Sequence, residues 1–204
     1  MIDASKSMFD KVYNEETEDY ESLFDVCLSV LENYLLSKIR EDPKERVSLL
    51  DRWWNISKVL KFNFQQVGVI FYNTEKSPDP QDDMDIPIVT PDKCAVWFPL
   101  QLIEPDMIRI VKNTRASDDF NDFDNKYGHS TDVKIADVLW LCSSLISFSR
   151  KQVRFLSINW FTNKDLPHTS GSPQYKEALE KTKDLQYMQP DVQIVPLKMD
   201  FNGD

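Results

Sequence analysis

Apolar residues recur every three or four positions along much of the chain, which is the spacing of an amphipathic helix. Between residues 18 and 40, for example, Leu23, Cys27, Val30 and Tyr34 fall on one face. Proline opens two of the periodic segments and an Asp-Pro pair ends another, because proline suits a first helical turn but disfavours continuation. The pattern predicts helices over residues 18–40, 44–60, 105–113, 131–148 and 173–189.

Continuous apolar runs, rich in β-branched and aromatic residues, separate these helices and predict strands. The run VGVIFY at 67–72 has no polar alternation, so we expect it to be buried on both faces as a central parallel strand. Helical crossovers between such strands indicate a doubly wound, mostly parallel α/β sheet with helices on both faces, in a single domain over residues 1–204. The strands are predicted at residues 1–2, 67–72, 95–103, 153–160 and 191–197.

The chain is acidic, with a formal net charge of -10 at pH 7, and its acid-rich segments 74–93 and 117–126 are predicted to be surface loops. An acidic surface repels phosphate, which disfavours tight binding of nucleic acid by this chain alone and favours a protein-facing role. The alternative, that the charge only aids solubility, stays open. Three scattered cysteines favour a reducing compartment. No membrane partner is expected, because no apolar run approaches the roughly 20 residues of a membrane span.

The most specific local pattern follows the first strand, where Asp3, Ser5 and Ser7 supply one carboxylate and two hydroxyls at alternate positions. Doubly wound sheets bind ligands at the carboxyl ends of their strands, and oxygen donors of this kind suit Mg²⁺ or Mn²⁺. Thr131, at the start of the predicted long helix, is expected at the same edge and completes the set of candidate metal ligands. A competing interpretation is that the two serines only cap the turn.

A third loop, after the strand predicted at 153–160, belongs to the same edge. The layout of the three loops resembles the metal-ion-dependent adhesion site of von Willebrand A domains, which combines Asp-x-Ser-x-Ser with a Thr and an Asp. Where that family has Thr-Asp-Gly, this chain has Thr162-Asn163-Lys164. Asn163 keeps an oxygen but loses a charge, so the resemblance implies at most weak Mg²⁺ binding and no other cofactor.

Patterns that indicate catalysis are missing from the sequence. A serine hydrolase needs a nucleophile, a base and an orienting group together, and the chain has neither a Gly-x-Ser-x-Gly element nor a Gly-x-x-x-x-Gly-Lys-Ser/Thr loop for nucleotide phosphates. The two histidines, His129 and His168, both lie in predicted loops. We therefore expect no catalytic residue and favour a binding module over an enzyme.

Six longer stretches carry a more specific pattern: IDASKSMF (2–9), VGVIFYNTEK (67–76), GHSTDVKIADVLWLCSSL (128–145), FTNKDLPH (161–168), KTKDLQYM (181–188) and PLKMDFNGD (196–204). In this order they resemble the N-terminal von Willebrand A-like domain of the smaller subunit of Ku, the heterodimer that binds DNA ends. The resemblance implies a nuclear protein that acts, within the heterodimer, in double-strand break repair by non-homologous end joining and in telomere maintenance. Ku is also named a DNA helicase, but no nucleotide motif here supports that activity.

The resemblance implies partners as well: the larger Ku subunit, end-joining and telomere proteins, and DNA ends reached through the full heterodimer with little contact from this domain. Candidate partner-binding residues are Thr131 and Asp132, together with Lys183, Asp184 and Tyr187 on the outer face of the helix at 173–189. A plain solvated helix face is the alternative. The rival hypothesis is a metal-dependent adhesion domain, in which the four candidate ligands hold Mg²⁺ and the carboxylate of an acidic partner completes the shell.

Overall fold

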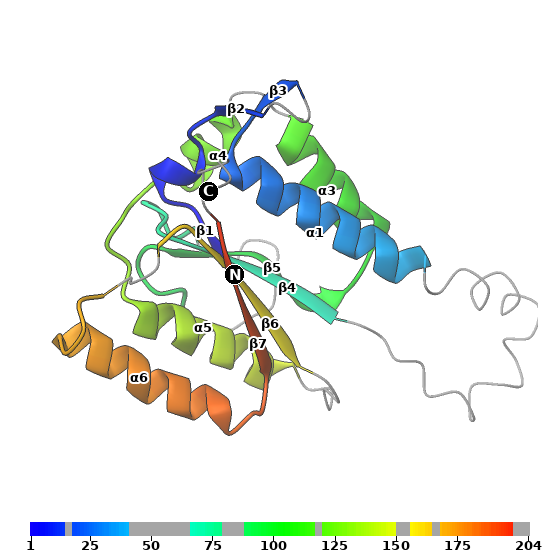
Figure 1. Ribbon diagram of the computed structural model, residues 1–204. Coiled ribbons are helices and arrows are strands. Elements are labelled where there is room, and N and C mark those ends of the chain that lie inside the picture. The colour runs from blue at the N-terminus through cyan, green and yellow to red at the C-terminus, as the bar shows by residue number, and fades with distance from the viewer. Residues whose placement is uncertain are drawn as a thin grey trace, which may run out of the picture.

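Figure 1 shows the computed structural model, in which a central sheet lies between two layers of helices. The strands of this sheet are β1 (Ile2–Asp3), β4 (Gln66–Tyr72), β5 (Cys94–Leu102), β6 (Ser157–Thr162) and β7 (Asp191–Pro196). They lie in the order β5-β4-β1-β6-β7. Neighbouring strands are parallel, except that the edge strand β5 is antiparallel to β4. The structure describes residues 1–14, 18–40, 66–78, 88–116, 120–149, 156–164 and 168–197.

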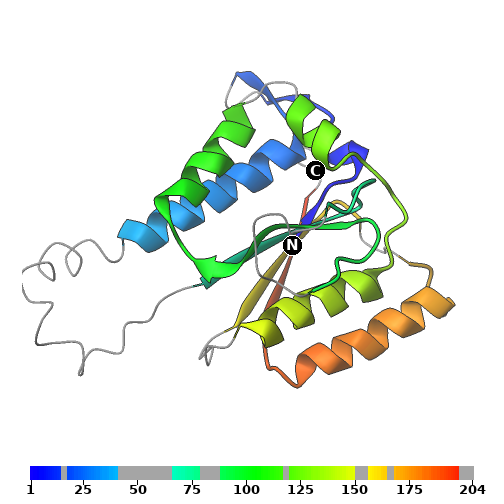
Figure 2. The ribbon, with the colours of Figure 1, turned by 180° about the vertical axis from the view of Figure 1, so that it is seen from behind.

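Helices cover both faces of the sheet, as Figures 1 and 2 show from opposite sides. The helices α1 (Leu23–Arg40) and α3 (Pro105–Ala116) lie on one face, and α5 (Ile135–Phe148) and α6 (Pro173–Gln186) lie on the other. β4 contributes to both cores, because Phe71 packs on the α1 side while Ile70 and Tyr72 pack on the α5 side. The predicted fold class, a doubly wound and mostly parallel α/β sheet, is confirmed.

The long apolar runs are found where the pattern placed them. The strands predicted at 67–72 and 95–103 match β4 and β5 within one residue at each end, and the strand at 191–197 matches β7. β6 begins at Ser157, four residues later than predicted, and extends two residues further. Residues 153–155 and the helix predicted at 44–60 lie outside the described residues.

The predicted start of the first helix was wrong for a local reason. Residues 19–21, assigned to the first helix, form the strand β3 (Asp19–Glu21), which pairs antiparallel with β2 (Val12–Asn14). The helix starts only after Ser22, whose Oγ accepts a hydrogen bond from the Asp25 backbone at 3.1 Å while the Asp25 carboxylate accepts one from the Ser22 backbone at 2.9 Å. This reciprocal cap fixes the start of α1.

The helical layers also differ in detail from the prediction. Residues 121–126, assigned to an acidic loop, form the short helix α4 (Asn121–Lys126), held to the core by buried Phe123. The helix predicted at 131–148 begins at Ile135, and α3 runs three residues past its predicted end. Among the described helices, none has the length and apolar character needed to cross a bilayer.

Candidate functional site

Three loops meet at the edge where the parallel strands β1, β4 and β6 end. Asn163, after β6, donates a hydrogen bond from Nδ2 to Ser7 Oγ in the loop after β1, at 2.8 Å. Lys164 donates from Nζ to the backbone carbonyl of Thr131 at 3.2 Å. The parallel register of the strands thus brings together the three segments that the sequence pattern assigned to one edge.

Asp3 lies at the centre of this edge and is fully buried. Its Oδ1 accepts hydrogen bonds from the Ser5 backbone N–H at 2.9 Å and from Asn73 Nδ2 at 2.8 Å. Its Oδ2 has no hydrogen-bond partner among the described residues. A buried carboxylate oxygen without a partner is costly, so Asp3 retains one oxygen with unused bonding capacity.

Asn73, which sequence reasoning did not single out, connects Asp3 to the loop before α5. Its side-chain Oδ1 accepts a hydrogen bond from the Val133 backbone at 3.2 Å, and its carbonyl accepts one from Ser130 at 2.6 Å. The residue has a φ of 62°, in the left-handed region that asparagine tolerates better than most residues. An asparagine directly after a buried strand favours a left-handed backbone conformation at that position, although it does not reveal which residues its side chain contacts.

The hydroxyl groups of the motif are only loosely organised. Ser5 is buried and Ser7 is exposed, and their Oγ atoms share a hydrogen bond of 3.3 Å. Ser5 occupies the N-cap position of the short 3-10 turn Lys6–Met8, but its side chain makes no capping hydrogen bond. Thr131 is exposed, and its backbone carbonyl, rather than its hydroxyl, makes the contact with Lys164.

The edge has only some of the features of a divalent cation site. Two buried oxygens, Asp3 Oδ2 and Asn163 Oδ1, lack hydrogen-bond partners among the described residues. Together with Ser5 and Ser7 they are the donors that could hold Mg²⁺. Across the described residues, however, no group of three or more acidic, cysteine or histidine side chains could hold a metal ion. With one carboxylate and the Lys164 ammonium group at the rim, this donor set fits a weakly held ion at best.

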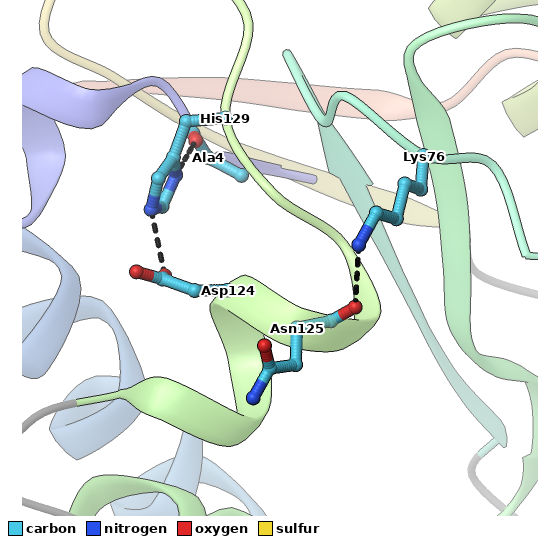
Figure 3. Close-up of polar contacts among 5 residues, drawn as sticks. All are labelled: Ala4, Lys76, Asp124, Asn125 and His129. Carbon is cyan, nitrogen blue, oxygen red and sulfur yellow. Dashed lines mark hydrogen bonds and ion pairs between the residues drawn. The ribbon is translucent and has the colours of Figure 1, made fainter.

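Both histidines make structural contacts. His129 Nδ1 lies 2.8 Å from the Ala4 carbonyl, and its Nε2 lies 2.8 Å from Asp124 Oδ1, so the ring links the motif loop to α4 (Figure 3). Both of these partners are hydrogen-bond acceptors, so each ring nitrogen faces an oxygen atom. His168 Nε2 accepts a hydrogen bond from the Ile135 backbone at 3.1 Å, at the start of α5. Each ring is therefore engaged in holding the backbone.

A further contact fixes α4 in the same region. Lys76, in the loop after β4, donates from Nζ to the carbonyl of Asn125 at 2.7 Å, as Figure 3 shows. The Lys76 backbone N–H also donates to the carbonyl of Tyr127 at 2.7 Å. Because these contacts join the loops after β1 and β4 to one short helix, they stabilise the edge on which the candidate site lies.

The candidate partner-binding residues fall into two separate groups. Thr131 and Asp132 are exposed at the site edge, near the start of α5. Lys183, Asp184 and Tyr187 are exposed at the end of α6, immediately before β7 begins. With a helical rise of about 1.5 Å per residue, α6 separates its two ends by roughly 20 Å. The two groups would therefore need a large partner, or two different partners, to be used together.

The fold and the edge define a class: a doubly wound α/β domain of the von Willebrand A type whose adhesion motif is incomplete. The family described as the Ku70/Ku80 N-terminal alpha/beta domain matches residues 54–203. This match covers more than half of the sequence, and the chain belongs to that family.

Curated relatives agree with this assignment. The chain is 27% identical over 200 residues to a protein of the tick Rhipicephalus appendiculatus named ATP-dependent DNA helicase 2 subunit 1. It is 24% identical over 187 residues to X-ray repair cross-complementing protein 6 of Mus musculus, and 29% identical over 152 residues to ATP-dependent DNA helicase 2 subunit 1 of Drosophila melanogaster. These alignments cover 97%, 91% and 72% of this chain but only 27%, 25% and 24% of the relatives. The chain therefore spans about a quarter of their length.

Proposed function

We propose that this chain is the N-terminal protein-interaction domain of the smaller Ku subunit. In this proposal it works in the nucleus, within the heterodimer that binds double-strand break ends for non-homologous end joining and telomere maintenance. Its partners are the larger Ku subunit and end-joining or telomere proteins. Membership in the Ku N-terminal family supports the proposal, and the net charge of -10 supports a protein-facing role over direct DNA contact.

The observation that carries the proposal is the way Asp3 is used. One of its two carboxylate oxygens, Oδ1, already accepts hydrogen bonds from Ser5 and Asn73, which leaves only Oδ2 for a cation. Asn163 supplies an amide where a second carboxylate would strengthen cation binding. In this proposal the edge serves mainly to hold three loops in place, and the exposed residues at its rim and on α6 contact partners.

The end of α6 supplies one such surface. Tyr187 has 87% of its surface exposed and lies one turn from Lys183 on the same side of the helix. Tyrosine beside charged residues is a frequent combination at protein interfaces. Asp184 also pairs with Lys181 at 3.1 Å, but this exposed ion pair contributes little to stability. A partner can therefore recruit Asp184 at small cost to the fold.

Co-elution tests the proposal. The chain, mixed with the purified larger Ku subunit or with purified end-joining proteins, is expected to form a complex on size-exclusion chromatography. Replacing Lys183→Glu together with Tyr187→Ala should weaken that complex, while the control Lys176→Glu, on the exposed first half of α6, should not. The chain alone should bind a blunt DNA duplex weakly. Absence of any complex, or tight binding to DNA by the chain alone, would contradict the proposal.

The second candidate function is a metal-dependent adhesion domain that binds an acidic partner through Mg²⁺. The unpartnered oxygens of Asp3 and Asn163 favour it. Calorimetric titration of the chain with Mg²⁺ and Mn²⁺ separates the two candidates. Tight binding that Asp3→Asn abolishes would support the adhesion function, and millimolar or undetectable binding would support the Ku-type function. Neither candidate function includes a catalytic step. ATP hydrolysis activity that co-purifies with the chain would contradict both.

A further inference from the structure

The antiparallel hairpin of β2 and β3 stands apart from the five-stranded sheet. Figures 1 and 2 show it above α4 and the start of α1, at the opposite end of the molecule from α6. Tyr13 and Tyr20 lie directly opposite each other on the two strands. Their ring centroids are 5.3 Å apart in a T-shaped arrangement, and the side chains are 49% and 64% exposed. The hairpin thus presents an aromatic pair to solvent.

A two-stranded hairpin is marginally stable in water unless its side chains pack against something. Tyrosine combines a large apolar ring with a polar end and is enriched in protein interfaces over other surfaces. An aromatic pair on the outer face of a short hairpin therefore indicates a surface that a partner covers.

The charges around the pair indicate the kind of partner. Asp10, Glu18 and Asp19 are exposed on or beside the hairpin, so acidic side chains lie close in the chain to both tyrosines. Asp19 Oδ1 accepts a hydrogen bond from the Tyr20 backbone at 2.7 Å, which leaves Oδ2 able to face a partner. The face of a tyrosine ring carries partial negative charge and attracts cations. Rings and carboxylates together therefore favour a positively charged ligand.

We propose that this hairpin is a docking surface for a basic, arginine-rich extended segment of a partner protein. A guanidinium group stacks on a planar ring and also pairs with carboxylates, so arginine uses both features of the surface at once, whereas lysine uses mainly the charge. The proposal goes beyond the function proposed above, because it involves neither α6 nor the candidate metal site.

Fluorescence anisotropy with a labelled synthetic peptide of alternating arginine and serine tests the proposal. The chain should bind this peptide, and should bind the matching lysine-serine peptide more weakly. Replacing both rings, Tyr13→Ser with Tyr20→Ser, should lower affinity about fivefold to tenfold, as expected for two exposed cation–π contacts. Replacing both with phenylalanine should retain the affinity, because the ring faces remain.

A charge-matched pair of variants excludes general attraction between an acidic protein and a basic peptide. Glu18→Gln removes one charge at the hairpin, and Glu180→Gln removes one charge on the exposed side of α6. Only Glu18→Gln should weaken binding. The proposal is overturned if the unaltered chain does not bind, if the two glutamine variants weaken binding equally, or if the phenylalanine variant loses as much affinity as the serine variant. The two glutamine variants decide the matter even if the serine variant does not fold.

Discussion

Asn73 Nδ2 donates a hydrogen bond to Asp3 Oδ1 at 2.8 Å, across the carboxyl ends of the neighbouring strands β4 and β1. The same asparagine accepts from the Val133 backbone, which lies sixty positions later in the chain. The Asn73 side chain therefore donates a hydrogen bond to a buried carboxylate and also holds the loop before α5. Asp3, the first aspartate of the motif, is thereby tied through Asn73 to the loop before α5.

Removing the Asn73 side chain should destabilise the domain. Asn73→Gly keeps the left-handed backbone accessible, so it isolates the loss of the side chain, whereas Asn73→Ala adds backbone strain at a φ of 62°. We expect the glycine variant to lose about 2–4 kcal/mol of unfolding free energy, because it removes one of the two hydrogen bonds to the buried Asp3 Oδ1 and leaves the Val133 backbone N–H unpaired. Urea denaturation measures this loss. Asn113→Ala, on the exposed side of α3, is the control and should change stability by less than about 0.5 kcal/mol. Equal stability of the two variants would contradict this role.

The sequence predicted the sheet well for a physical reason. Strands such as β4 are buried on both faces, so they carry uninterrupted apolar residues that no loop or amphipathic helix would show. The motif residues Asp3, Ser5 and Ser7 were correctly placed at the edge of the sheet, because the ends of parallel strands meet there.

The features that the sequence did not predict depend on tertiary contacts. The helix α4 is too short for helical periodicity to appear, and buried Phe123 holds it in place. The β2–β3 hairpin is strongly acidic and has no Asn-Gly or Asp-Gly turn signal. The role of Asn73 rests on bonds to residues far away in the sequence, and no local pattern encodes such partners.

Gly128 is required beside Glu75. Its φ is +61°, and a Cβ at this position would lie 2.7 Å from Glu75 Oε2 and 2.8 Å from Glu75 Cβ. We expect Gly128→Ala to cost about 2–4 kcal/mol of unfolding free energy, through backbone strain and steric overlap together. Gly171→Ala is the matched control, because its φ is +82° but, apart from its chain neighbours, no atom of the described residues lies within 4 Å of the added Cβ.

Thermal or urea unfolding of both glycine variants measures the difference. Gly171→Ala should lower the unfolding free energy by only about 1 kcal/mol, because it adds backbone strain without steric overlap. Adding Glu75→Ala to Gly128→Ala should recover part of the loss, since it removes the atoms that the new Cβ would meet. If the two glycine variants are equally destabilised, the contact with Glu75 has no role.

Restoring the adhesion motif should create a stronger cation site. The double substitution Asn163→Asp with Lys164→Gly adds a second carboxylate and removes the ammonium group that contacts Thr131. We expect the affinity for Mn²⁺ to rise at least about tenfold, because a second anionic ligand joins the unpartnered oxygen of Asp3. Isothermal titration calorimetry gives the affinity. Adding Asp3→Asn to this variant should abolish the gain, and a gain that persists would show that the ion binds elsewhere.

Burial of two cysteines should make the domain less stable at alkaline pH. Burial raises the pKa of the Cys27 thiol and of the Cys94 thiol from 9.0 to about 12. Because the folded pKa values are raised, the stability that comes from keeping the two thiols neutral is fully present below pH 9.0. It is lost as the pH rises toward about 12. Each buried thiol should lower the unfolding free energy by about 1.4 kcal/mol per pH unit in this range.

Urea denaturation at a series of pH values between 8 and 11 tests the effect for Cys27. Cys27→Ala should lower stability at pH 8 but should reduce the slope against pH by about 1.4 kcal/mol per unit between pH 9 and 11. Val111→Ala, which truncates a fully buried side chain in the same core, is the control and should lower stability by the same amount at every pH. If both variants keep the slope of the unaltered chain, the Cys27 thiol does not stay neutral in the folded state.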